Sequence, residues 1–250
     1  MFKAAEVPVV AQAAAARDGM AISFQESSLA HIAEGPVALV KLDTLQPIAR
    51  VGQYILLDPE ERDPCDGDLV IAETESGDRY TRRFWRKGDA IHLEAQNATP
   101  PNYAPVVLNC GTCWMRRIIG VAFEPCRDIN PGAVAAEWVP PNGYSIDLLS
   151  DAVGVRVKGT SLEPIAWDDQ FALVRKCGNI AVVKPNTLAC VDIAEEGAVI
   201  KRCYPGTDEW LLCSVNVNEP QEPMRVKPSS ILNVYPLIGV LFEAVAEDQT

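Results

Sequence analysis

The sequence lacks several features that would identify common classes of protein. No apolar run approaches the roughly 20 residues that a membrane-spanning helix needs. The amino terminus has no basic segment followed by a long apolar stretch, which is the pattern of a secretory signal. Only 2 of the 250 residues are histidine, and both lie in the first half, so a Ser–His triad in the second half is not expected. We expect a cytoplasmic protein without membrane contact.

Positive charge is scarce as well. The chain has 22 Lys and Arg against 34 Asp and Glu, a formal net charge of −12. Because affinity for a phosphate backbone needs clustered basic residues, direct nucleic-acid binding is not expected. One basic cluster, residues 82–87, is interleaved with Phe84 and Trp85. It can grip a nucleic acid or form a solvated hairpin with its aromatic side chains in the core, and the hairpin is favoured.

The 8 cysteines are too sparse for a disulfide scaffold. Cys110 and Cys113 are the only close pair. A zinc site there would need further ligands at suitable spacing, and His92 and Cys126 are the only candidates. We therefore expect buried, reduced thiols, no metal and no cofactor.

What the sequence does contain is a repeat that extends over most of its length. Its period is much longer than the roughly 20 to 50 residues of a solenoid module, so it predicts a duplicated domain. The first pair of matching segments aligns without a gap, and an insertion changes the offset of the later pairs. The matching segments are residues 40–57 and 157–174, 80–84 and 199–203, 93–97 and 212–216, and 118–124 and 237–243.

Short runs of β-branched and aromatic residues alternate with Gly, Pro, Asp and Asn, which predicts strands and turns. We expect a mainly β fold of two tandem domains, residues 1–124 and 143–250, joined by a proline-rich linker at residues 125–142. Helices are expected only at residues 8–17, 28–33 and 145–150. The expected strands include residues 53–57, 68–72, 90–94, 171–174, 179–183, 198–203 and 209–214.

The second copy carries two residues that can do chemistry together. Ser161 lies in the turn at residues 159–164, where a hydroxyl projects from a tight bend. Lys201 lies in an apolar run, and strand alternation puts it on one face with Val199 and Cys203. An amine among apolar neighbours loses solvation, which favours the neutral form that can act as a base. Each residue alone is typical of a structural position, but the pair can form a Ser–Lys dyad.

The pattern around these two residues resembles the peptidase domain of LexA, UmuD and phage repressors. The turn Val-Lys-Gly-Thr-Ser-Leu-Glu-Pro at residues 157–164 is similar to the Gly-x-Ser-Met-x-Pro turn of that family, and Val-Ile-Lys-Arg at residues 199–202 is similar to its lysine strand. Asn216 and its counterpart Asn97 also fit the family. The departures are Leu162 in place of Met, and Asp169 with Gln170 where Gly-Asp is typical.

The resemblance implies a nucleophilic Ser161 and a general base at Lys201. In the first copy, Thr44 and Arg82 occupy the equivalent positions, and Leu42 replaces the turn glycine. Arginine cannot realistically lose its proton, so it cannot serve as a base. We interpret the first copy as a degenerate peptidase domain that is kept for packing or binding.

Members of this family cleave themselves in a segment that precedes the peptidase domain. Residues 7–16 are similar to that segment, and the bond between Ala15 and Ala16 would be the one cleaved. Residues 133–137 are a fainter version before the second copy. Neither keeps the glycine that the family has at this point. The family's helix-turn-helix domain is not expected either, because only about forty residues precede Thr44.

Two functions follow. The first is a self-cleaving or regulatory Ser–Lys peptidase of phage, mobile-element or SOS type. The second is a catalytically silent interaction module, in which the two domains form an intramolecular pseudo-dimer that mimics a repressor dimer. We expect a protein partner of repressor, polymerase or recombinase type, and either a monomer with an internal pseudo-dimer or a homodimer. A generic two-domain β protein that shares the motif by chance is the third interpretation.

Overall fold

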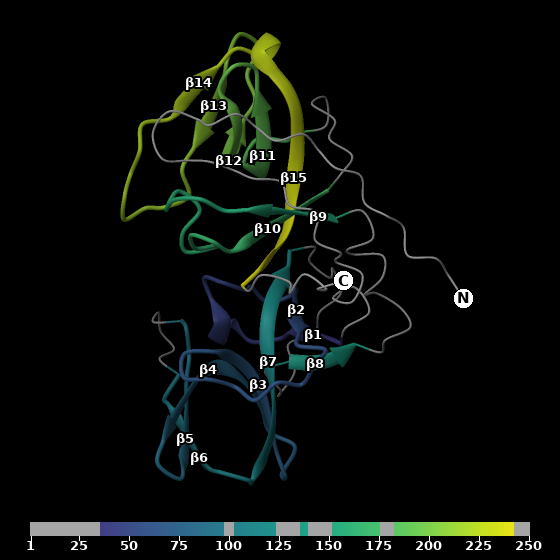
Figure 1. Cartoon of the computed structure of the whole chain (residues 1–250), viewed down its shortest axis with the longest axis vertical. Coiled ribbons are helices and arrows are strands. Elements are labelled where there is room, and N and C mark those ends of the chain that lie inside the picture. The colour runs from purple at the N-terminus through teal and green to yellow at the C-terminus, as the bar shows by residue number, and fades with distance from the viewer. Residues whose placement is uncertain (1–35, 98–102, 124–135, 140–151, 176–182, 243–250) are drawn as a thin grey trace, which may run out of the picture. The chain divides into compact units, whose positions relative to one another are not determined.

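The computed structural model describes residues 36–97, 103–123, 136–139, 152–175 and 183–242 (Figure 1). They fall into two compact units, a first unit within residues 31–148 and a second within residues 149–250. Nearly all regular structure of the described residues is antiparallel strand, which confirms the mainly β expectation. The helices expected at residues 8–17, 28–33 and 145–150 lie outside the described residues, as do Ala15 and Ala16.

The first unit, purple to teal in Figure 1, is a continuous antiparallel path of strands in the order β6-β5-β4-β3-β7-β2-β1-β8. A short 3-10 helix, η1, follows the first strand. The bounds are β1 Val37–Val40, η1 Asp43–Leu45, β2 Tyr54–Leu57, β3 Leu69–Thr74, β4 Arg79–Lys87, β5 Ala90–Glu94, β6 Val106–Asn109, β7 Cys113–Ala122 and β8 Ala136–Val139.

The second unit, green to yellow, follows the same path, and its described residues include no counterpart of β8: its order is β14-β13-β12-β11-β15-β10-β9. The bounds are β9 Ala152–Arg156, β10 Phe171–Arg175, β11 Thr187–Ile193, β12 Gly197–Tyr204, β13 Trp210–Cys213, β14 Met224–Val226, η3 Pro228–Ser230 and β15 Ile231–Leu241.

In each unit one long strand belongs to two sheets. The first half of β15 pairs with β11 and its second half with β10, and Figure 1 shows it as a long, bent strand. The strand β7 divides in the same way between β3 and β2. Because one strand joins both sheets, the turn after β9 and the hairpin β11–β12 belong to one continuous framework.

The central hairpins of the two units have the same register. Arg82 on β4 lies opposite Val70 on β3, and Lys201 on β12 lies opposite Ala189 on β11. Arg82 and Lys201 lie in the middle of β4 and β12, and all four paired residues are buried. The register therefore fixes each cationic side chain at an equivalent, interior position of its unit.

Two local irregularities also recur. The pairing of β2 with β7 shifts between Leu56 and Leu57, and that of β10 with β15 shifts between Leu173 and Val174. A positive φ occurs at Gly52 before β2, and again at Asp169 before β10, with values of 93° and 69°. The positive φ of Asp169 explains why the family that the sequence resembles typically has glycine at this position, since left-handed backbone favours glycine.

Among the strands that the sequence pattern did not place, two are important for the topology. The strand β8 falls inside the segment expected to be a linker, and it pairs with β1. The strand β11 is central to the second unit, whereas the strand expected at residues 179–183 lies almost wholly outside the described residues. In β11 the usual alternation of buried and exposed residues is obscured, because its middle residues, Ala189 to Val191, are all buried.

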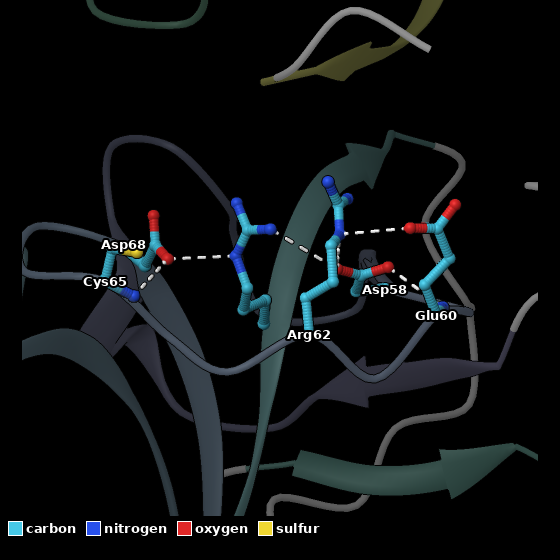
Figure 2. A network of polar contacts seen from close by, with 6 residues as sticks. Asp58, Glu60, Arg62, Cys65 and Asp68 are labelled. Carbon is cyan, nitrogen blue, oxygen red and sulfur yellow. Dashed lines mark hydrogen bonds and ion pairs between the residues drawn. The ribbon is translucent and has the colours of Figure 1, made fainter. Parts of the chain in front are cut away.

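A polar network stabilises the first unit between β2 and β7. Asp58, at the end of β2, has a fully buried side chain that accepts hydrogen bonds from Arg62 Nε at 2.7 Å and Arg117 Nη1 at 3.3 Å (Figure 2). Arg117 on β7 also donates from Nε to Asp68 at 2.9 Å. The Asp68 carboxylate in turn accepts the backbone amide of Cys65. The loop between β2 and β3 is thereby tied to the long strand.

We expect Asp58→Asn to lower the free energy of unfolding by about 2 to 3 kcal/mol, because it leaves two arginines near a neutral group in a buried site. Urea denaturation of the variant measures this loss. Glu60→Gln is the matched control: its carboxylate is 62% exposed and pairs with Arg62 at 3.4 Å, so removing its charge should change stability by less than about 0.5 kcal/mol. Equal effects of the two substitutions would contradict the role given to Asp58.

Candidate functional site

Ser161 lies in an ordered turn that follows β9. Gly159 has a φ of 83°, and its amide donates to Asp168 Oδ1 at 2.7 Å. The Leu162 side chain is buried, so the leucine fills the core position that the family usually gives to methionine, a swap of similar volume. Ser161 itself is only 5% exposed. The turn thus holds a hydroxyl in a largely desolvated place.

The turn is fastened to the loop that follows β13. The carbonyl oxygen of Ser161 accepts the amides of Val215 at 2.8 Å and Asn216 at 3.2 Å, and the Ser214 hydroxyl at 2.9 Å. The buried Asn216 side chain donates to the carbonyl of Thr160 at 2.9 Å. The asparagine singled out from the sequence is therefore a clamp between turn and loop.

Lys201 lies in the middle of β12 and is only 4% exposed. The apolar cluster beneath β12 includes Val199 and Cys203, the two residues expected on the same face as the lysine. The amine donates to Oε1 of Gln221 at 2.9 Å. The hydrogen bond described for Lys201 thus goes to Gln221 rather than to the Ser161 hydroxyl.

Burial lowers the pKa of Lys201, because a desolvated ammonium is less stable than a desolvated amine; Cys213 nearby opposes the shift to a smaller extent. A lower pKa increases the fraction of neutral amine at a given pH. The neutral amine is the only form that can accept a proton from a hydroxyl. The environment of Lys201 therefore favours the state that a general base requires.

The loop between β13 and β14 contacts both parts of this site. Gln221 reaches the lysine, while Glu219 accepts a hydrogen bond from the Thr160 hydroxyl at 2.6 Å. The Asn216 Oδ1 atom accepts the amides of Asn218 at 2.9 Å and Glu219 at 3.3 Å, which shapes the loop. The serine turn and the lysine strand are thus joined through one loop.

The equivalent site of the first unit has the same frame. Thr44 lies in η1 and is buried, and its carbonyl oxygen accepts the amides of Gln96 at 2.8 Å and Asn97 at 3.2 Å. Its hydroxyl lies 2.9 Å from the hydroxyl of Thr81 on β4. In the second unit Ile200 takes the place of Thr81 and offers no hydrogen-bonding group. The threonine hydroxyl is engaged by a neighbour that the serine site does not have.

Arg82 occupies the place of Lys201 and is 6% exposed. Its Nη1 atom donates to the carbonyl of Ala104 at 2.9 Å, and its guanidinium lies 5.6 Å from the ring centre of Tyr103. Among the described residues, its buried Nε has no hydrogen-bond partner. Burial lowers the pKa of Arg82, yet a guanidinium stays protonated, so this site holds a fixed positive charge.

Other expectations about reactive and basic residues have mixed outcomes. Cys190 and Cys203 are buried, as expected, and burial raises the pKa of each thiol to about 12. Cys65 and Cys110 are exposed, which corrects the expectation of buried thiols. Cys126 lies outside the described residues.

Within the described part of the chain no three His, Cys, Asp or Glu residues gather in a way that could hold a metal, and no helix is long and apolar enough to span a membrane.

The basic cluster at residues 82–87 forms most of β4. Phe84 is buried, and Trp85 donates to Glu94 at 3.1 Å. Arg83 donates to Gln96 at 2.8 Å, whereas Arg86 and Lys87 are exposed. This is the hairpin interpretation of the cluster, with its first arginine and its phenylalanine turned inward.

Sequence reasoning missed the residues that contact the two cations and the first hydroxyl. Gln221, Thr81 and Tyr103 lie in segments that no motif marks. Their positions matter only because hairpin register and loop path bring them to the site. Of the three, only Thr81 lies in a matching segment, where it faces Ile200 in the alignment, and this was the sole signal in the sequence.

Folding should couple to the proton on Lys201. Because the folded state has the lowered pKa, the unfolded state binds more protons between that pKa and 10.5, the ordinary value, so the lysine makes the folded state more stable as pH rises through this window. We expect wild type to gain stability relative to Lys201→Met as the pH rises from neutral toward 10.5. Urea unfolding at several pH values measures the difference in stability between the two proteins. The buried thiols of Cys190 and Cys203 lower stability as the pH rises, but both proteins contain them, so their contribution cancels in the difference. A stability difference that does not change with pH would contradict the lowered pKa of Lys201.

Comparison with known proteins bears on one part of the chain. Residues 4–122 match the family model described as Peptidase S24-like. The match includes Thr44 and Arg82 and ends before Ser161 and Lys201. Comparisons with curated proteins and with solved structures gave no significant match. The match supports a LexA-like peptidase domain, in agreement with the resemblance drawn from the sequence.

Proposed function

We propose that the protein is a LexA-like serine peptidase of the self-cleaving or regulatory kind, whose active dyad is Ser161 and Lys201. We also propose that it arose by tandem duplication and that the first unit is a degenerate copy. The shared strand order, hairpin register and bulge position support the duplication. A place in phage, mobile-element or SOS-type regulation follows from the resemblance alone.

The observation that carries the proposal is the burial of Lys201 in the middle of β12, with a pKa below its ordinary value. A buried lysine that forms no ion pair with any described residue is costly to keep, so its presence favours a chemical role over a structural one. The buried Ser161 turn, fastened by Asn216 to the loop that also contacts Lys201, supplies a hydroxyl in the same framework.

In the proposed reaction, neutral Lys201 takes the proton of the Ser161 hydroxyl while the serine oxygen attacks a peptide carbonyl carbon. A backbone amide of the turn stabilises the oxyanion. The resulting ammonium then gives its proton to the leaving amine as the peptide C–N bond breaks. Water, deprotonated by the same lysine, releases the acyl group from Ser161 and restores the dyad.

We expect Ser161→Ala and Lys201→Met each to abolish self-processing, with rates at least about 10³-fold below wild type. The measurement is mass spectrometry of the purified chain incubated at mildly alkaline pH, where the neutral amine is more abundant. Thr44→Ala is the matched control, because it alters the equivalent position of the first unit and should leave the rate unchanged. If Thr44→Ala stops processing and Ser161→Ala does not, the dyad is assigned to the wrong unit.

A second candidate is a catalytically silent interaction module with a protein partner of repressor, polymerase or recombinase type. It is favoured by the family match, which falls on the unit that carries Arg82 in place of the lysine. In this case the two units act as an internal pseudo-dimer, and the chain is a monomer.

Affinity capture with wild type and Ser161→Ala tests this candidate, together with the mass of the chain from light scattering. The interaction module predicts the same captured partner for both proteins, a monomer mass, and no processing of either. A peptidase that acts on its partner instead predicts that Ser161→Ala retains an uncut partner which the wild type cleaves.

A further inference from the structure

The strongest unassigned contact in the second unit joins Gln221 to Lys201. Gln221 belongs to an exposed stretch of the loop between β13 and β14, yet its Oε1 atom accepts a hydrogen bond from the buried amine at 2.9 Å. The same loop is fixed by Asn216 at its start and by the bond between Glu219 and Thr160. The loop that carries Gln221 is therefore held in place by hydrogen bonds that do not involve the lysine.

An amide oxygen suits this position for a chemical reason. A neutral amine has two N–H groups and one lone pair, and an acceptor that takes one N–H restricts rotation about the Cε–Nζ bond. The lone pair can then be held toward a hydroxyl. A carboxylate would also accept the hydrogen bond, but its charge would stabilise the ammonium and raise the pKa of the lysine.

Among the described residues, no charged group takes the place of Gln221 as the hydrogen-bond partner of the Lys201 amine. Within the described residues Lys201 forms no ion pair. Cys213 on β13 lies opposite Arg202 and is close enough to Lys201 to oppose the lowering of its pKa to a small extent. Glu219 and Glu222 lie in the loop, but the Glu219 carboxylate is bonded to Thr160. In the first unit the cation is held by a loop in the equivalent place, through the backbone carbonyl of Ala104. Among the described residues, the cation of the second unit thus donates to a side-chain oxygen, and that of the first unit to a backbone oxygen.

The geometry points to Gln221 as a positioning residue for Lys201, which holds the amine so that its lone pair is available to Ser161. This inference rests on the proposed peptidase function. Gln221 acts through the lysine and does not touch the substrate.

The test measures how fast a fluorophosphonate probe labels Ser161 across a range of pH, in the full-length protein. In this reaction the serine oxygen bonds to phosphorus, fluoride leaves, and the proton passes to Lys201. We expect Gln221→Leu to slow labelling by about tenfold at high pH, where the amine is neutral in both proteins, since it removes one hydrogen bond to the base. Gln221→Glu should be slow near neutral pH and approach the wild-type rate at higher pH, because it restores an acceptor but raises the lysine pKa. Asn218→Ala is the control for a general effect of altering the loop.

Equal loss at every pH for the leucine and glutamate variants, or a wild-type rate for Gln221→Leu, would overturn the positioning role. The pKa of Lys201, followed by NMR of isotope-labelled lysine and assigned with Lys201→Met, gives a readout that needs no activity. We expect it to rise in Gln221→Glu and to fall in Gln221→Leu. If wild type is not labelled at Ser161 while these shifts occur, the peptidase proposal fails although the contact is real. If labelling occurs without the shifts, the peptidase stands and the Gln221 inference fails.

Discussion

The arrangement of both sites depends on one pair of backbone hydrogen bonds. The carbonyl of the hydroxyl-bearing residue accepts two successive amides from the loop that follows the β4–β5 or β12–β13 hairpin, with nearly identical lengths at Thr44 and Ser161. These bonds hold the turn against the hairpin that carries the buried cation. Side-chain hydrogen bonds add to this attachment, from Asn216 to Thr160 in the second unit and between Thr44 and Thr81 in the first.

On this shared frame, the side chains decide what each site can do. Lys201 is buried and can be neutral, whereas Arg82 is equally buried and stays charged. Thr44 shares a hydrogen bond with Thr81, and the equivalent Ile200 has no such group. Arginine stays protonated, so the first site cannot use Arg82 as a base. The hairpin register is the same in both units, so it does not depend on which cation is buried.

Parts of the fold and site were predictable because they depend on local pattern. The strand at residues 90–94 agrees with β5 and that at 171–174 with most of β10, since both alternate or are continuously apolar. Asn216 was singled out because the resemblance implies an asparagine after this strand. β8 was not, because its role is to pair with β1, far away in the sequence. Gln221 was not, because an exposed loop residue has no periodicity that would mark it.

The sequence by itself determined the mainly β class, the repeated pattern and the contrast between a lysine and an arginine at one position, because these depend only on residue type and spacing. The tertiary structure decided that the lysine and the serine are both buried, that Asn216 fastens the turn, and which side chain accepts a hydrogen bond from the amine. Those features arise from hairpin register and loop path, which bring together residues separated by tens of positions in the chain.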